Sequence, residues 1–213
     1  MKNKILLLAA LGLVILGSSF LIGGPEESIA LGTKAPMSDH KMMGIDDKGH
    51  TLASLAGKNG LLVIFSCNTC PFVIGNGEKT EGWEGRYAEL YKSCTAKETG
   101  MVLINSNEAK RDAGDSMDDM KHHAKEQGYA QIPYVIDTNH QLADAFGAKT
   151  TPHVFLFNAN MELIYKGAID DNVDRASEVE QRWLINALRS NMAGKTIDPA
   201  ETRATGCSIK RVK

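Results

Sequence analysis

Residues 61–71 read LLVIFSCNTCP, an apolar run that passes directly into two cysteines and a proline. Five apolar residues without alternation, bounded by Gly60 and Ser66, predict a strand that is buried on both faces in the middle of a helix-covered sheet. Pro71 is suited to the first turn of a helix, where its missing N–H needs no partner. The stretch therefore predicts a central strand that ends in a cysteine pair at the start of a helix.

The spacing of Cys67 and Cys70 predicts a redox site. At the start of a helix, Cys-x-x-Cys places two sulfurs one turn apart and leaves the first sulfur near unpaired backbone N–H groups. These donors and the helix dipole stabilise a thiolate, the form that attacks disulfides. We therefore predict Cys67 as the nucleophile and Cys70 as the resolving thiol, with a redox-active disulfide between them.

A second candidate element is Thr151-Pro152, which comes directly before an apolar run at 154–157. In a site of this kind, a cis bond between these residues would hold the chain beside the dithiol. It would also leave the Thr151 backbone free to pair with an extended partner peptide. We therefore predict that Thr151 and Pro152 bind the substrate.

The rest of the chain alternates strands with helices and ends in a hairpin and a helix. The turn-rich segment 31–60 predicts an N-terminal hairpin extension. Further strands are predicted at 101–105, 134–137, 154–157 and 163–165, and helices at 83–91, 116–127, 142–146 and 177–194, the last with a capping box Ser177-x-x-Glu180. This order predicts an α/β protein with a mixed central sheet flanked by helices.

Residues 1–24 differ from the remainder of the 213-residue chain. Lys2 and Lys4 precede an apolar run at 5–22, followed by glycines and a proline, which is the order of an export signal. The run is also long enough to span a bilayer, so a cleaved signal peptide and a retained membrane tether both remain open. Either predicts an extracytoplasmic location, periplasmic or secreted. The net charge of -2 gives no indication of nucleic acid binding.

We divide the chain into the segment 1–24, a domain at 25–196 and a tail at 197–213 that lacks a helical or strand period. Outside the cytoplasm, thiols can be held as disulfides. Cys94 falls on the apolar face of a predicted helix, which favours a buried thiol. Cys207 follows a glycine in the tail and could attack a Cys67–Cys70 disulfide, resolve an oxidised Cys67, or pair with Cys94.

Several separated motifs resemble the thioredoxin-like redoxin family, over roughly residues 31 to 213. The motifs are Phe-x-Cys-Asn-x-Cys-Pro at 65–71, Thr-Pro-x-Val-Phe-Leu-Phe at 151–157, Gly-Ala-Ile-Asp-Asp-Asn at 167–172 and Gly-Cys-Ser-Ile-Lys at 206–210. The resemblance implies the thioredoxin fold and a thiol–disulfide oxidoreductase that exchanges electrons with protein thiols or disulfides and an electron-donor protein. The run 61–65 lacks the acidic residue that thioredoxins bury there as a proton carrier.

Two other functions remain open. The first is a peroxidase of the peroxiredoxin-like type, in which Cys67 or Cys70 becomes a sulfenic acid and another cysteine resolves it. The second is copper(I) delivery by the dithiol, with His40, His50 and Met42-Met43 upstream. A zinc site would need about four ligands, and the adjacent pair His122-His123 suits a solvated helix face. We predict no resident metal and no cofactor.

Overall fold

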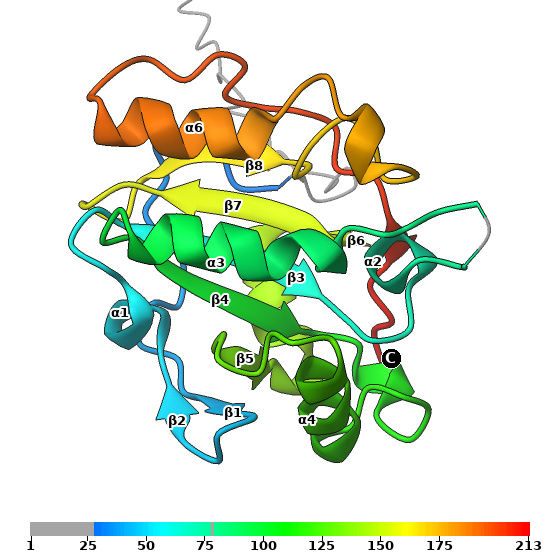
Figure 1. Ribbon diagram of the computed structural model, residues 1–213. Coiled ribbons are helices and arrows are strands. Elements are labelled where there is room, and N and C mark those ends of the chain that lie inside the picture. Colours follow the sequence, from blue (N-terminus) through cyan, green and yellow to red (C-terminus); the bar gives the residue numbers. More distant parts are fainter. Residues whose placement is uncertain (1–27, 78) are drawn as a thin grey trace, which may run out of the picture.

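The computed structural model describes residues 28–77 and 79–213 (Figure 1). The predicted export segment 1–24, with its apolar run at 5–22, lies outside the described residues. In the part of the chain that is described, no helix has the length and apolar character needed to cross a bilayer.

A seven-stranded mixed sheet forms the centre of the molecule, in the order β2-β1-β5-β4-β3-β7-β8 (Figure 1). Strands β3, β4 and β5 are parallel, whereas β1, β7 and β8 each pair antiparallel with a neighbour. The strand bounds are β1 Met42–Gly44, β2 Gly49–His50, β3 Leu61–Ser66, β4 Gly100–Asn105, β5 Tyr134–Ile136, β7 His153–Phe157 and β8 Leu163–Gly167. The mixed sheet is confirmed, and the β1–β2 pair forms the predicted N-terminal hairpin.

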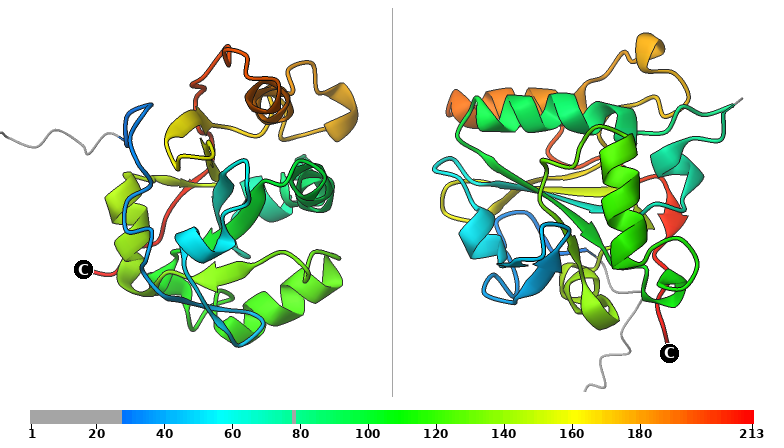
Figure 2. Two further views of the ribbon diagram at one scale, coloured as in Figure 1. Left: turned by 90° about the vertical axis from the view of Figure 1, so that its left-hand side faces the viewer. Right: turned by 60° about the horizontal axis from the view of Figure 1, so that its bottom comes forward.

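Helices cover both faces of this sheet. Figure 2 shows α3, α4 and α6 on one face and α5 on the other. The helices are α1 Leu52–Leu55, α2 Pro71–Ile74, α3 Tyr87–Thr95, α4 Met117–Glu126, α5 Gln141–Phe146 and α6 Trp183–Met192, and short 3-10 turns lie at Glu84–Arg86, Glu108–Lys110, Thr138–His140 and Ala176–Glu178.

Strand β3 is buried on both faces, as the apolar run predicts. Leu62 and Ile64 belong to the apolar cluster that includes residues of α3, α4 and α6. Leu61, Val63 and Phe65 belong to the opposite cluster, which includes residues of α1 and α5. Alternate side chains of one strand therefore fill two cores, and this fixes the position at which the strand delivers the cysteines.

The prediction of a capping box at Ser177 is wrong. The last helix begins six residues later, at Trp183, without a side-chain cap. The Glu180 N–H instead donates to Asp171 Oδ1 at 3.1 Å, and the Leu184 N–H donates to the Ile169 carbonyl at 3.1 Å. Hydrogen bonds to the loop that follows β8 replace the first turn of the predicted helix.

Candidate active site

The two cysteines of the dithiol lie in the turn that joins β3 to α2. Cys67 is 0 % exposed and Cys70 is 2 % exposed. Cys70 is the N-cap residue of α2, and Pro71 is the first helical residue. Cys67 therefore lies three residues ahead of the N-cap, whereas the sequence prediction placed it at the helix terminus itself.

The structure brings the predicted substrate-binding residues against both sulfurs. Cys67 Sγ lies 3.2 Å from Thr151 Oγ1, and Cys70 Sγ lies 3.2 Å from the Thr151 carbonyl oxygen. The Thr151–Pro152 peptide bond is cis. Residues 84 positions apart in the sequence thus form one compact site, because β7 pairs antiparallel with β3 and begins directly after Pro152.

The two thiols differ strongly in acidity. The pKa of Cys70 is lowered to about 5, first by a hydrogen bond from the Cys67 thiol and also by the thiol and backbone N–H of Cys207 and the Thr151 hydroxyl. The Thr151 carbonyl oxygen favours the protonated form of Cys70, because a carbonyl oxygen can only accept a hydrogen bond and the thiol must donate it. Burial also raises the pKa of Cys70, but the hydrogen-bond donors together outweigh both effects, so the net shift of the pKa is downward.

The pKa of Cys67 moves the other way. It is raised well above its usual value by the hydrogen bond to Cys70, by burial and by the negative charge of Asp115. A thiolate is therefore favoured on Cys70 and a thiol on Cys67. These contacts favour roles opposite to those predicted from helix position.

Asp115 holds the turn between the two cysteines. This carboxylate is fully buried in the loop before α4. Its Oδ1 accepts from the Asn68 N–H at 2.7 Å and from Asn105 Nδ2 at 2.8 Å. Its Oδ2 accepts from Thr69 Oγ1 at 2.8 Å and from Asn107 Nδ2 at 3.1 Å. Four hydrogen bonds to one carboxylate fix the backbone that carries the dithiol.

Sequence reasoning missed Asp115, since it looked for an acidic residue in the preceding strand. The carboxylate comes instead from a loop 48 positions after Cys67 in the chain. The polar run 105–107 at the end of the neighbouring parallel strand was the available signal. Carboxyl ends of parallel strands meet at one sheet edge, so such a run marks a polar pocket beside the dithiol.

The C-terminal tail also reaches the site, although it lacks a regular sequence pattern. Residues Cys207–Ser208 form strand β9, which pairs antiparallel with β6 at Thr150–Thr151. In Figure 1 the red tail passes beside β6 and α2. Cys207 is half-buried, and burial together with its hydrogen bond to Cys70 raises its pKa to about 11. The site thus holds a third cysteine next to Cys70.

The fourth cysteine lies away from these three. Cys94 is 0 % exposed on α3, which confirms that it is buried, and burial raises its pKa to about 12. All four cysteines are free thiols in the structure. Cys94 therefore does not belong to the thiol site.

Two of the histidines considered for copper or zinc binding are paired with carboxylates. His50 Nε2 lies 2.8 Å from Asp46 Oδ1, and His123 Nε2 lies 2.7 Å from Glu84 Oε2. Met42 is buried in the core. Across residues 28–77 and 79–213, no group of three or more His, Cys, Asp or Glu side chains is arranged to hold a metal ion.

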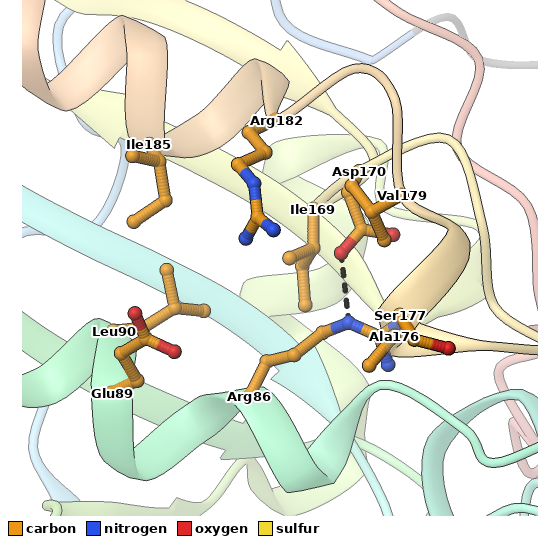
Figure 3. Close-up of a pocket in the computed structure, with 10 residues that line it drawn as sticks. All are labelled: Arg86, Glu89, Leu90, Ile169, Asp170, Ala176, Ser177, Val179, Arg182 and Ile185. Carbon is orange, nitrogen blue, oxygen red and sulfur yellow. Dashed lines mark ion pairs between the residues drawn. The ribbon is translucent and has the colours of Figure 1, made fainter.

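A pocket of about 330 Å³ lies between α3 and the start of α6 (Figure 3). Leu90 and Ile185 line it from the two helices. At its wall Arg86 Nε pairs with Asp170 Oδ2 at 2.8 Å, the contact drawn in Figure 3, and Asp170 also accepts from Trp83 Nε1 at 2.7 Å. None of its lining residues is a cysteine, so the pocket is separate from the thiol site.

The chain also matches a protein-family model whose members fit this fold and dithiol. The Redoxin model matches residues 30–181, which is more than half of the chain. The chain belongs to the Redoxin family. Family membership gives this redoxin an oxidoreductase character, with thiols or disulfides as its general class of substrate. The tail that carries Cys207 lies beyond the matched residues.

Solved structures confirm the thioredoxin-like fold. An uncharacterized conserved protein from Geobacillus kaustophilus is 28% identical with a TM-score of 0.76, covering 86% of this chain and 93% of its own. A hypothetical protein from Sinorhizobium meliloti is also 28% identical with a TM-score of 0.76, covering 87% of this chain and 97% of its own. The peroxidoxin BcpB from Mycobacterium tuberculosis shares the fold at 12% identity and a TM-score of 0.55, covering 75% and 96%. A search among curated proteins found no match.

Proposed function

We propose that this redoxin is a thiol–disulfide oxidoreductase that cycles between a dithiol and a disulfide at Cys67 and Cys70. The observation that carries the proposal is the position of both sulfurs against Thr151, each at 3.2 Å, with opposite shifts in pKa. Cys70 is then the thiolate that attacks first, and Cys67 is the protonated thiol that attacks in the second step.

The exchange with a partner disulfide proceeds in two displacements. The Cys70 thiolate attacks one partner sulfur, forming a mixed disulfide and releasing the other partner sulfur as a thiolate. The Cys67 thiol then gives its proton to that thiolate and attacks Cys70 Sγ, which breaks the mixed disulfide. The partner leaves with two reduced sulfurs, and the protein keeps a Cys67–Cys70 disulfide. The reverse steps oxidise a partner dithiol.

Reduction of insulin by dithiothreitol, with and without the protein, tests this activity. We expect the wild type to accelerate it, and Cys67→Ser and Cys70→Ser to lose about a thousandfold in rate because each lacks one sulfur of the cycle. Cys94→Ser is the matched control and should keep the wild-type rate. If both active-site variants remain active, the proposed function is wrong.

Trapping distinguishes the two role assignments. In a Cys207→Ser background, which removes the third thiol beside Cys70, the contacts at Cys70 favour a mixed disulfide through Cys70 in Cys67→Ser, and little trapping through Cys67 in Cys70→Ser. The helix-position argument predicts the opposite pattern. Mass spectrometry of the partner-bound peptide identifies the sulfur in each variant, and equal trapping by both would contradict either assignment.

We further propose that the protein acts outside the cytoplasm on protein thiols or disulfides, recharged by an electron-donor protein. Lys2, Lys4 and the apolar run 5–22 support export. Fractionation of cells, with N-terminal sequencing of the recovered protein, tests the location and tells a cleaved signal from a retained tether. Recovery of the whole protein from the cytoplasm would contradict export.

Peroxide reduction is a second candidate, favoured by the contact of Cys207 with the low-pKa sulfur of Cys70. The Cys70 thiolate would take an oxygen from the peroxide to give a sulfenic acid and an alcohol or water. A neighbouring thiol would then form a disulfide with Cys70 and release water. Peroxide consumption coupled to dithiothreitol measures this activity, and its absence in the wild type would exclude it.

A further inference from the structure

The C-terminal tail is held against the thiol site by hydrogen bonds from the three residues 209–211 that follow Cys207. The Ile209 N–H donates to the Lys149 carbonyl at 2.9 Å, and the Ile209 side chain is 5 % exposed. The Lys210 N–H donates to Asn107 Oδ1 at 2.9 Å, and Arg211 Nε donates to Asp144 Oδ1 at 2.7 Å. Main chain and side chains together fix the tail in register.

The tail takes the place that was predicted for a partner peptide. Thr151 pairs with Cys207 across the β6–β9 ladder, so the prediction that its backbone is free is wrong for this arrangement. Gly206 lies so close to the same residue that an added Cβ would be 2.2 Å from the Thr151 carbonyl oxygen. The segment 206–208 therefore covers the edge on which an extended peptide would pair.

The three cysteines of the site differ in their exposure to a partner. Cys67 and Cys70 are 0 % and 2 % exposed, whereas Cys207 is half-buried. The Cys207 thiol and backbone N–H both hydrogen bond to Cys70, and the Phe72 backbone hydrogen bonds to Cys207. The most accessible of the three sulfurs thus belongs to the residue that pairs with Thr151 and interacts with the inner sulfur Cys70.

We propose that Cys207 is the exchange residue of this redoxin, which relays disulfide bonds between external thiols and the buried Cys67–Cys70 pair through a Cys70–Cys207 disulfide. The relay rests on the proposed oxidoreductase function and adds to it the route by which electrons enter and leave: while the tail is docked a partner exchanges with Cys207, and direct attack of Cys70 on a partner requires the tail to be displaced. The tail acts as a permanently attached peptide substrate, bound by β6 through the same backbone pairing.

When external thiols reduce the Cys67–Cys70 disulfide, each step exchanges one disulfide for another. The Cys207 thiolate attacks Cys70 Sγ, forming the Cys70–Cys207 bond and releasing Cys67, which takes up a proton. An external thiolate then attacks Cys207 Sγ and displaces the Cys70 thiolate. A second external thiol releases Cys207, so two external thiols leave as one disulfide. Cys70 is the favoured leaving group because its thiolate is the most stable of the three.

Mild oxidation of Cys67→Ser with one equivalent of diamide, a thiol oxidant, tests the central bond of the relay. We expect an intrachain Cys70–Cys207 disulfide in most molecules, identified by peptide mass spectrometry. Cys70→Ser treated in the same way should give little Cys67–Cys207 disulfide, because Cys207 contacts Cys70. If Cys67→Ser forms intermolecular dimers and no Cys70–Cys207 bond, the relay is wrong.

The rate of reduction of the oxidised protein by glutathione completes the test. Cys207→Ser should retain the Cys67–Cys70 disulfide but lose about tenfold or more in its reduction rate, because the accessible sulfur is missing. Cys94→Ser is the control and should react like the wild type. A wild-type rate in Cys207→Ser would overturn the relay and leave the proposed function intact. Failure of the wild type to form any Cys67–Cys70 disulfide would overturn the proposed function, and the relay with it.

Discussion

Helix α3 and the C-terminal tail each carry one cysteine outside the Cys-x-x-Cys pair, and the two differ in what surrounds the sulfur. Cys94 on α3 is 0 % exposed among apolar residues such as Leu90. Cys207 in the tail is half-buried and contacts Cys70. Their pKa values are raised to similar levels, about 12 and about 11. Their pKa values therefore do not distinguish the two thiols, whereas the contact of Cys207 with Cys70 does.

The role of each of these two cysteines follows from its accessibility and from the residues around it. Burial raises the pKa of both thiols by disfavouring the charged form. Cys94 packs in the apolar cluster that includes Leu90, and no interaction with another cysteine is among the causes of its raised pKa. Cys207, by contrast, pairs with Thr151, whose carbonyl oxygen accepts from Cys70, so both cysteines meet at the same residue.

The largest expected effect is in the alkylation of the native protein by N-ethylmaleimide. Cys207 should react about a thousandfold faster than Cys94, because Cys94 becomes accessible only on unfolding. Below a pKa of about 11, the Cys207 thiolate fraction rises about tenfold per pH unit, so its rate should climb from pH 7 to pH 9 without a plateau. Time-resolved peptide mass spectrometry measures both rates, and equal rates would remove the contrast.

Release of the tail should give the next largest effect. Ile209→Asp places a charge at a position that is 5 % exposed, which opposes docking of the tail. We expect Cys70 to be alkylated about ten to a hundred times faster, while Cys94 stays protected. Val212→Asp, at a residue that is 42% exposed, is the matched control. An unchanged Cys70 rate in Ile209→Asp would show that the tail does not shield the site.

A smaller change tests the close approach at Gly206. Gly206→Ala brings a Cβ to 2.2 Å from the Thr151 carbonyl oxygen, so the β6–β9 pair must shift at a cost of about 1–3 kcal/mol. Cys70 alkylation should rise severalfold with little change in global melting temperature. Gly85→Ala, where nothing lies within 4 Å of the added atom, should have no effect. A tail that stays docked in Gly206→Ala would contradict this account of the contact.

The smallest effect on activity is expected at Cys94. Cys94→Ala removes a buried sulfur from the packing of α3, which should lower the free energy of unfolding by about 1–2 kcal/mol. Reduction of insulin should stay within about twofold of the wild type. Urea denaturation and the activity assay measure the two quantities. A large loss of activity in a well-folded variant would give Cys94 a role that its position does not explain.

The sequence located the elements that local patterns encode. The apolar run 61–65 predicted β3, and the paired apolar runs after Pro152 predicted the β7–β8 hairpin, because burial on a sheet leaves a direct signature in the side chains. The start of α6 was predicted six residues early, since hydrogen bonds from Glu180 and Leu184 to a distant loop override the local capping signal. Local propensity decides an element only where tertiary contacts do not compete for its backbone.

For the site, local patterns in the sequence pointed to the candidate groups: the Cys67 and Cys70 pair, the Thr151-Pro152 element, and a third thiol at Cys207. They did so because reactivity belongs to residue type and short spacing. Three properties of the site come from the folded chain: Asp115 holds the dithiol turn, the pKa of Cys70 is the lowered one, and the tail pairs with β6 and brings Cys207 to Cys70. These properties depend on contacts between residues far apart in the chain. Hydrogen bonds, charge and burial from several segments act together on the same sulfur, and no local pattern encodes their combined effect.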